Sequence, residues 1–388
     1  MRTTVGWQAT TTGTPPRRPS LETLRRTPLQ RRDLRPDDLA IRVDYCGVCH
    51  SDLHAVRTHD AHADRGDTGS TPLVPGHEFT GVVTETGPEV TGFTVGDPVA
   101  VGNIVDSCGT CAMCRLGQEN FCHAFPTLTY GGRDRHDGST TLGGYSREYV
   151  VRDRFAYPLP AALDPAAAAP LLCAGVTVWE PLHALGVGPG TRVAVAGLGG
   201  LGHLAVKIAV ALGADTSVIS RSPDKTDDAR RLGAGDLIVS TAPKQMADAH
   251  ERFDVVIDTV SAPHDLAPYL RLVALDGTLS QLGHLGPVTV ETTDLLVGRK
   301  KLSSAGSGGR PATAALLEFC ADHGITADIE LLPSSHVNEA LDRLQHNDVR
   351  YRFVLDMSDL DRPRTTMAEQ PEATSESPSP ARARVVRR

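Results

Sequence analysis

VAVAGLGGLGHLAVKIAVAL, residues 193–212, carries the clearest signal of how this chain folds. Val193–Ala196 has the composition of a buried strand, and the run His203–Leu212 has the pattern of a helix. The glycines between them permit a tight turn and let the backbone approach a pyrophosphate, whose charge the helix N-terminus then meets. The sequence therefore predicts a dinucleotide site formed by Gly197, Gly199, Gly200, Leu201 and Gly202.

The next predicted strand, Ser217–Ser220, ends in residues that suit a phosphate group. An acidic side chain at this point would bind a ribose 2′-hydroxyl and repel a 2′-phosphate. The sequence instead continues as Ser220, Arg221 and Ser222, with Lys225 shortly after. Two hydroxyls and two cations favour NADP(H) over NAD(H). A solvated basic turn is the alternative, and we expect the nearby Asp224 to cap the following helix.

Further strands and helices alternate after about residue 165, which is typical of a parallel, doubly wound sheet. The predicted strands there include Leu237–Val239, Val255–Ile257 and Thr278–Leu282, followed by a helix at Ala312–His323 and a strand at Phe353–Asp356. Shorter strands precede this region and indicate a small antiparallel or barrel-like domain: Leu39–Tyr45, Gly81–Thr86, Pro98–Gly102 and Tyr149–Val151. The predicted fold class is therefore α/β, with a Rossmann domain beside a β-rich domain.

Three segments are expected to lie outside this regular structure. Residues 1–30 are predicted to be poorly ordered or at most a weak first strand. His59–Thr71 is polar and is expected to form an exposed loop. The residues beyond Met357 are rich in Pro, Ser, Glu and Arg and cannot bury a core, so residues 358–388 are predicted to be a disordered tail.

Composition excludes several classes of protein. The chain has 388 residues, which exceeds the size at which a single core usually stops growing, so two domains are expected. A net charge of −8 argues against a nucleic-acid partner, and no apolar stretch is long enough to predict a membrane span. The first twenty residues lack the apolar core of a signal peptide, so a cytoplasmic protein is expected.

Four of the eight cysteines are clustered in DSCGTCAMCRLGQENFC, residues 106–122. Two, two and seven residues separate successive members of the quartet, which consists of Cys108, Cys111, Cys114 and Cys122. Four thiolates close a tetrahedron around zinc and leave no open position, so we predict a structural zinc site. Four reduced cysteines in a loop, or an iron–sulfur cluster with the same ligand type, are the alternatives.

A second metal site is predicted from three segments that lie far apart in the sequence. They are YCGVCHSDLH (residues 45–54), VPGHEF (74–79) and LLCAGV (171–176). Cys49, His77 and Cys173 would supply two thiolates and one imidazole, which leave a zinc ion with one open position for catalysis. Cys46 is interpreted as buried packing, although a metal-binding Cys46–Cys49 pair is the alternative.

Together these segments resemble the cinnamyl alcohol dehydrogenase-like branch of the zinc-dependent medium-chain dehydrogenase/reductase family, from about Leu39 to Met357. The motifs on which this resemblance rests also include TYGG with LGGYS, LLCAGVTVWEPL, GLGGLGH and DVRYRFVLDM. The resemblance implies a GroES-like catalytic domain at residues 1–170 and 306–357, a Rossmann domain at 171–305, and a homodimer formed through the Rossmann domains.

The resemblance also implies roles for residues around the catalytic zinc. Glu78 would lie behind the metal as an alternate ligand, and Asp52 would orient His77. Ser51 would contact the substrate oxygen and start a proton relay that His54 completes with solvent, although a plain loop histidine is the alternative for His54. His50 would lie near the cofactor pyrophosphate.

The predicted function is hydride transfer between NADP(H) and an alcohol/aldehyde pair, with two zinc ions per chain, one catalytic and one structural. The segment from Ala55 to Pro72 is longer and more polar than is usual in the family, so the resemblance does not predict which alcohol or aldehyde is the substrate. One alternative is a reductase of a specialised metabolite that acts on an iminium or a conjugated double bond. Another is a zinc- and nucleotide-binding protein without catalysis.

Overall fold

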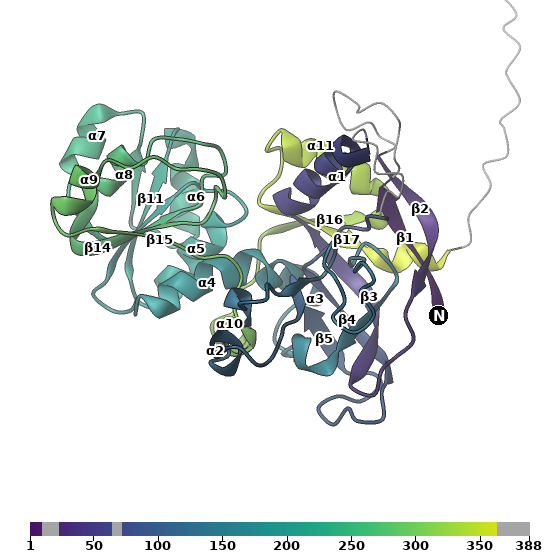
Figure 1. Ribbon diagram of the computed structural model, residues 1–388. Coiled ribbons are helices and arrows are strands. Elements are labelled where there is room, and N and C mark those ends of the chain that lie inside the picture. The colour runs from purple at the N-terminus through teal and green to yellow at the C-terminus, as the bar shows by residue number, and fades with distance from the viewer. Residues whose placement is uncertain (10–22, 64–71, 363–388) are drawn as a thin grey trace, which may run out of the picture.

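The computed structural model describes residues 1–9, 23–63 and 72–362, which form two lobes (Figure 1). One lobe contains a six-stranded parallel sheet and helices α5 to α9, and the other contains a seven-stranded sheet with α1 and α11. Helices α4 (Ala174–Ala184) and α10 (Arg310–His323) lie where the lobes meet. Side chains from α4, α5 and α10 belong to one continuous apolar core.

The six-stranded sheet has the strand order β12-β11-β10-β13-β14-β15. Its strands are β10 (Arg192–Ala196), β11 (Asp215–Ser220), β12 (Asp236–Val239), β13 (Phe253–Asp258), β14 (Val273–Gln281) and β15 (Lys301–Ser304). Its helices are α5 (Gly202–Ala211), α6 (Thr226–Arg231), α7 (Pro243–Asp248), α8 (Ala267–Leu270) and α9 (Thr292–Leu296), with a 3-10 turn η4 at Pro223–Lys225. The order reverses between β10 and β13, which is the topological switch point where doubly wound sheets bind nucleotides.

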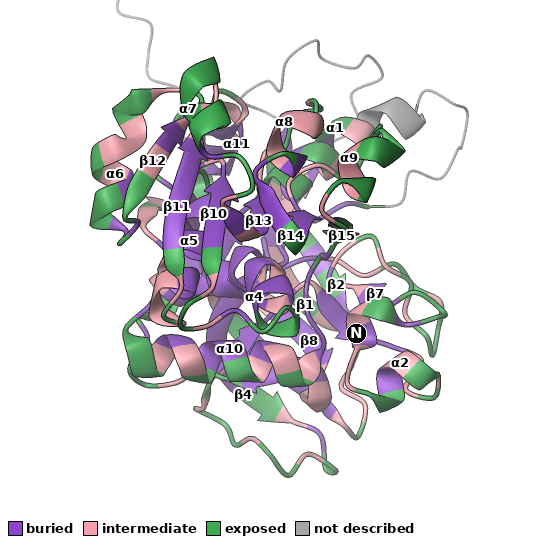
Figure 2. Ribbon diagram, turned by 90° about the vertical axis from the view of Figure 1, so that its left-hand side faces the viewer, coloured by how far each residue is buried: buried purple, intermediate pink, exposed green. Residues whose placement is uncertain are grey.

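The apolar run of β10 is buried on both faces of this sheet. Val193 and Val195 join the core that faces α4 and α5, while Ala194 and Ala196 join a second core on the opposite face. Figure 2 shows that the strands of this sheet are buried inside the lobe, while the largely exposed helices α6, α7 and α9 lie on its outside. A strand covered on both faces needs a continuous apolar run, and this explains why VAVA was predictive.

The second sheet has the order β16-β17-β3-β4-β5-β9, with β8 paired to β3. Its strands are β3 (Asp38–Val48), β4 (Phe79–Thr86), β5 (Pro98–Val101), β8 (Glu148–Arg152), β9 (Ala156–Pro158), β16 (Ile329–Pro333) and β17 (Arg352–Asp356). All pairings except β16 with β17 are antiparallel. Strands from both ends of the chain therefore build one domain around β3.

Smaller elements complete the second lobe. They are β6 (Ile104–Asp106), β7 (Thr127–Leu128), α1 (His50–Ala63), α2 (Ala112–Arg115), α3 (Pro165–Ala168), α11 (Val337–Gln345), and the 3-10 turns η1 (Glu119–Phe121), η2 (Asp153–Phe155), η3 (Ala169–Leu172), η5 (Ser334–His336) and η6 (Met357–Asp361). No helix of the described residues is both long and apolar enough to cross a lipid bilayer.

The prediction of little order in residues 1–30 was wrong for the described part. β1 (Arg2–Ala9) and β2 (Leu24–Arg31) pair in antiparallel register. The buried Arg31 guanidinium donates to the carbonyl oxygen of Gly143 at 2.7 Å and to the Ser146 hydroxyl at 2.6 Å. These partners lie more than 100 residues away, and local sequence patterns do not reveal such contacts.

Two other predicted boundaries need correction. Helix α1 extends to Ala63, so the first residues of the expected loop 59–71 are helical, because no glycine or proline interrupts the chain before Gly66. The residues just after Met357 form η6 and bury Leu360, so the tail does not begin at residue 358. Residues 64–71 and 363–388, where the rest of both predictions falls, lie outside the described residues.

Candidate active site and metal centres

Cys49, His77 and Cys173 converge on one point between the lobes. Cys49 follows β3, His77 precedes β4, and Cys173 precedes α4. The sulfur atoms of Cys49 and Cys173 lie 3.9 Å apart, and the Nε2 atom of His77 lies 3.2 Å from the Cys173 sulfur. A tetrahedral zinc site with bonds of about 2.3 Å to sulfur separates its ligand atoms by roughly 3.7 Å, so the three residues fit a zinc ion.

Cys46 does not belong to this group. Its side chain is fully buried, and its thiol faces the carbonyl oxygen of Gly47 at 3.7 Å. The ligand atoms that lie within 4.8 Å of one another come from Cys49, His77 and Cys173. The geometry therefore favours the three-segment site over a Cys46–Cys49 pair.

Asp52 is a fully buried carboxylate that holds this arrangement together. Its oxygens accept hydrogen bonds from the Nδ1 atom of His77 at 3.0 Å, the backbone N–H groups of Cys49 and Gly76 at 3.0 Å, and the Tyr145 hydroxyl at 3.2 Å. Because a carboxylate only accepts, the imidazole carries its proton on Nδ1 and leaves Nε2 free for a metal.

Replacing Asp52 with asparagine is expected to lower zinc occupancy at this site and to reduce activity by about 10- to 100-fold, the usual cost of losing a carboxylate behind a metal-binding histidine. Zinc content and kcat measured on the same preparation test this expectation. The exposed Asp33→Asn variant is the control for the charge change. Full metal content and wild-type kcat in Asp52→Asn would show that this carboxylate does not orient His77.

Glu78 lies next to this site and forms a buried ion pair with Arg352. The Nη2 atom of Arg352 lies 2.6 and 2.8 Å from the two carboxylate oxygens, and both side chains are at most 3% exposed. Burial raises the pKa of Glu78 to about 7, and the Arg352 guanidinium opposes this shift. Sequence reasoning gave Arg352 no role, although a lone cation beginning the apolar strand RFVLD is a signal of a buried partner.

Ser51, His54 and His50 lie at the start of α1, beside the metal ligands. The hydroxyl of Ser51 lies 3.7 Å from the Cys49 sulfur. Ser51 and His54 are both exposed and three residues apart on the helix, a spacing that places them on the same side. His50 is also exposed. The arrangement leaves Ser51 close to the metal site and His54 open to solvent.

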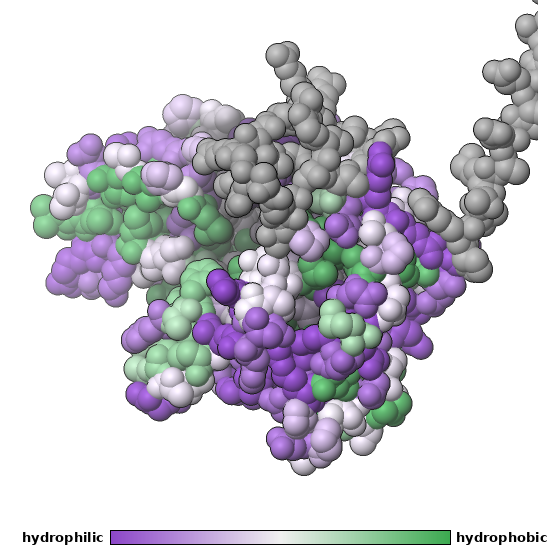
Figure 3. Space-filling view, turned by 45° about the vertical axis from the view of Figure 1, so that its right-hand side comes forward, coloured by the Kyte–Doolittle hydropathy of each residue, from purple (hydrophilic) through white to green (hydrophobic). Residues whose placement is uncertain are grey.

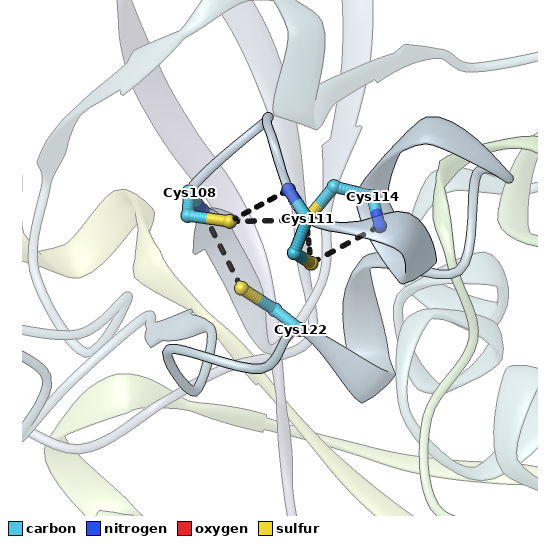
Figure 4. Close-up of side chains that lie close together, drawn as sticks. All are labelled: Cys108, Cys111, Cys114 and Cys122. Atoms are coloured by element: carbon cyan, nitrogen blue, oxygen red, sulfur yellow. Dashed lines mark hydrogen bonds between the residues drawn. The ribbon is translucent and has the colours of Figure 1, made fainter.

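The cysteine quartet forms a separate cluster (Figure 4). The sulfur of Cys114 lies 3.8 Å from that of Cys108 and 3.5 Å from that of Cys111, and the backbone N–H of Cys108 faces the Cys122 sulfur at 3.5 Å. Backbone N–H groups at Thr110 and Cys111 lower the pKa of Cys108 to about 5, which favours the thiolate form that binds metal. These four residues fit a closed, structural zinc site.

This cluster is anchored to the start of α10. Glu119, which is almost fully buried, accepts a hydrogen bond from the backbone N–H of Arg310 at 2.9 Å. A β-carbon built on Gly309 would lie 1.9 Å from the carbonyl oxygen of Gly117, so the two backbones are in direct contact. The segment that carries the quartet, residues 106–122, therefore helps to support α10.

The glycine-rich turn has the conformation that the dinucleotide prediction requires. Gly197 has a φ of +88°, and a β-carbon on Gly202 would lie 2.0 Å from the carbonyl oxygen of Gly197. His203 fixes the turn from below, since its Nδ1 atom lies 3.1 Å from the Gly199 carbonyl oxygen and its Nε2 atom accepts from the backbone N–H of Asp328 at 3.3 Å. Burial lowers the pKa of His203 to about 3, so the ring is neutral.

Gly200 brings the turn close to the metal site. A β-carbon on Gly200 would lie 2.8 Å from the Cδ atom of Arg352, whose guanidinium reaches Glu78. Gly199 is exposed, and a β-carbon on it would meet no described atom within 4 Å, while Leu201 precedes α5. Arg352 therefore lies between the predicted pyrophosphate site and the metal ligands.

Ser220 ends β11, and Arg221, Ser222 and Lys225 follow it as predicted, so no acidic residue occupies the strand end. The backbone N–H of Ser222 donates to the Ser220 hydroxyl at 3.4 Å. The expected cap by Asp224 was wrong, because the Ser222 hydroxyl instead accepts the Asp224 backbone N–H at 3.1 Å. The Nζ atom of Lys225 lies 5.7 Å above the ring of Tyr351.

Comparison with known proteins places this architecture in a family. Residues 35–161 match the model of the alcohol dehydrogenase GroES-like domain, and residues 200–322 match the model of zinc-binding dehydrogenases. NADP-dependent alcohol dehydrogenase C 1 of Mycolicibacterium smegmatis is 45% identical over 87% of this chain and 96% of its own length.

Two solved structures show the same fold. Cinnamyl alcohol dehydrogenase SbCAD4 from Sorghum bicolor superposes with a TM-score of 0.83 at 42% identity, over 92% of this chain and 98% of that one. The cinnamyl alcohol dehydrogenase of Helicobacter pylori complexed with NADP(H) has a TM-score of 0.81 at 32% identity, with the same coverage.

These matches confirm the predicted fold class, a GroES-like domain with a Rossmann-type domain, and the predicted enzyme class, an alcohol dehydrogenase oxidoreductase. The expected zinc and NADP(H) agree with a zinc-binding family, with a relative solved with NADP(H), and with the two cysteine-containing groups of ligands. The chain therefore belongs to the zinc-dependent alcohol dehydrogenase family of medium-chain dehydrogenases, in the neighbourhood of the cinnamyl alcohol dehydrogenases.

Proposed function

We propose that this chain transfers a hydride between NADP(H) and an alcohol/aldehyde pair, and that Cys49, His77 and Cys173 hold its catalytic zinc. The observation that carries the proposal is the convergence of these three side chains beside a glycine-rich turn, with Arg352 spanning the distance between them. The quartet of Cys108, Cys111, Cys114 and Cys122 would hold the second, structural zinc.

Different residues around the three-ligand site would perform different steps of the reaction. Zinc at the three-ligand site would polarise the carbonyl oxygen, and NADPH would supply the hydride. Asp52 keeps the proton on the Nδ1 atom of His77 and so maintains the ligand set. Ser51, beside Cys49, would donate a proton as the carbonyl oxygen becomes an alcohol. His54, exposed on the same helix, would return a proton from solvent.

The remaining roles belong to the surroundings of the site. Glu78 would serve as an alternate zinc ligand if its ion pair with Arg352 opened, and His50 would contact the cofactor pyrophosphate. Gly197, Gly199, Gly200, Leu201 and Gly202 would hold that pyrophosphate, and Ser220, Arg221, Ser222 and Lys225 would bind the 2′-phosphate. Residues 1–170 and 306–357 would form the catalytic domain, and residues 171–305 the dinucleotide domain.

We also propose a homodimer. Several apolar side chains in the segment that runs from β14 to the edge strand β15 are exposed: Leu275 (66%), Leu285 (85%), Leu296 (72%) and Val297 (60%). Figure 3 shows hydrophobic side chains gathered on the lobe of the six-stranded sheet. An unpaired edge beside apolar surface favours pairing with a second copy. A cytoplasmic location fits two clusters whose thiols must stay reduced to bind metal.

Purified protein assayed against a panel of aldehydes tests the function. The expected result is aldehyde reduction with a kcat/KM at least about 100-fold higher for NADPH than for NADH, because two cations contact a 2′-phosphate that NADH lacks. The panel should include iminium compounds and conjugated alkenes. Reduction confined to those compounds, or equal use of both cofactors, would overturn the proposal.

Replacing Ser51 with alanine is expected to lower kcat for aldehyde reduction by about 100-fold, the lower range for loss of a positioned proton donor, with zinc content unchanged. The exposed Ser139→Ala variant is the matched control. Steady-state kinetics of both variants, with zinc determined on the same samples, decide the matter. Wild-type kcat in Ser51→Ala would remove Ser51 from the relay.

A further inference from the structure

Three consecutive side chains at the start of β17, those of Arg350, Tyr351 and Arg352, connect the two lobes. The guanidinium of Arg350 donates to the Asp228 carboxylate of α6 at 2.7 Å. The ring of Tyr351 stacks on His203 at the start of α5, with centroids 4.8 Å apart and an interplanar angle of 14°. Arg352 reaches Glu78 beside the metal ligands. The segment therefore contacts α6, the glycine-rich turn and the metal site in turn.

Two carboxylates beside α5 and α6, those of Asp328 and Asp228, are already paired with cations. The Asp328 carboxylate accepts both Lys207 at 2.5 Å and Arg231 at 2.7 Å, and Asp228 accepts Arg350. Among residues 1–9, 23–63 and 72–362, no carboxylate forms an ion pair with Lys225 or Arg221. The two carboxylates are thus committed to other cations, and Lys225 is left to pack against the face of Tyr351.

The geometry brings Arg350 near Lys225. Lys225 and Asp228 are three residues apart at the start of α6, so Asp228 holds the Arg350 guanidinium on the side that Lys225 occupies. Tyr351, the neighbour of Arg350, carries the Lys225 ammonium group above its ring. Burial and the charge of Arg350 both lower the pKa of Lys225. Two cations that approach each other, one of them three residues after Ser222 in the same turn, suit a multiply charged anion.

We infer that Arg350 is a further binding residue for the 2′-phosphate of NADP(H), contributed by the opposite lobe from Ser220, Ser222 and Lys225. This inference rests on the proposed NADP dependence. The Arg350 side chain is 61% exposed, so it is free to turn from Asp228 toward a phosphate. The 2′-phosphate would then be held from both lobes, by a segment whose third residue, Arg352, lies against the glycine-rich turn.

The test uses 2′,5′-ADP and 5′-ADP, which differ mainly in the phosphate on the 2′ position, with binding measured by calorimetry on the full-length protein. Wild type is expected to bind 2′,5′-ADP at least about tenfold more tightly than 5′-ADP. Arg350→Ala is expected to lose about tenfold in affinity for 2′,5′-ADP and less than about twofold for 5′-ADP, and Arg350→Lys to recover part of the loss.

Arg230→Ala is the matched control, since Arg230 is 72% exposed on the same helix as Asp228, and its one ion pair among the described residues is with Asp227, at 4.0 Å. Unchanged affinity of Arg350→Ala for 2′,5′-ADP, in a wild type that does prefer it, would overturn the role of Arg350 alone. Equal loss for both ligands would also overturn it, because the residue would then act on the fold. A wild type without preference for 2′,5′-ADP would overturn the NADP dependence itself.

Discussion

Cys173→Ala is expected to lose one of two zinc ions per chain and to lower kcat/KM for aldehyde reduction by at least about 1,000-fold. The variant keeps only Cys49 and His77, whereas a catalytic zinc requires three protein ligands. Lewis-acid stabilisation of the developing negative charge contributes several kcal/mol to such a reaction, and about 4 kcal/mol corresponds to a factor of 1,000. Zinc analysis and steady-state kinetics on one preparation measure both effects.

Cys46→Ala is the control for this experiment. Cys46 is buried three residues before Cys49 but lies outside the ligand group, so its variant should keep both zinc ions and activity within a few-fold of wild type. The opposite pattern, with metal lost from Cys46→Ala and kept by Cys173→Ala, would contradict the geometry and assign the metal to a Cys46–Cys49 pair.

Disrupting the quartet is expected to lower the stability of the protein first and its catalytic activity only as a consequence. In Cys122→Ala the second zinc should be lost, and the apparent melting temperature should fall by about 10 °C, since removing a metal belongs to the most costly class of substitutions. Without the metal, residues 106–122 are held by the short helices, by the Asp106–Arg152 ion pair and by the contacts of Gly117 and Glu119 with the start of α10. Thermal unfolding and zinc content together measure the effect.

Limited proteolysis locates the change within the chain. Arg115 is exposed in the segment that carries the quartet, so trypsin should cut after it at least about ten times faster in Cys122→Ala than in wild type. Cys320→Ala is the control, because Cys320 is buried in α10 and belongs to neither group of metal ligands. A Cys122→Ala protein that resists trypsin and melts like wild type would show that the quartet does not hold a structural metal.

The parts of the fold that the sequence predicted correctly are those with local, repetitive patterns. VAVA is apolar on both faces and is followed at once by a glycine-rich turn, so β10, the turn and α5 could be placed within one or two residues. The metal ligands were predictable for another reason. A Cys₂His set in three segments, beside a four-cysteine cluster, matches few sites other than zinc sites.

The parts that could not be predicted depend on contacts between distant segments. β2 has the sequence LRRTPLQR, which has no continuous apolar face, and its order depends on Arg31 and on pairing with β1. Arg350 and Arg352 are two charged residues in a terminal strand segment, and only their partners in α6 and beside His77 give them a function. Their partners are 122 and 274 residues away, beyond the range of sequence periodicity.

Stepwise withdrawal of zinc with a chelator shows whether a metal held by Cys49, His77 and Cys173 carries the reaction. Zinc per chain and the rate of NADPH-dependent aldehyde reduction are followed in the same samples. We predict that the rate falls in proportion to the loss of one zinc and returns when zinc is restored, while the other zinc stays bound. A protein that reduces aldehydes at its full rate after losing both ions would contradict a catalytic role for the metal.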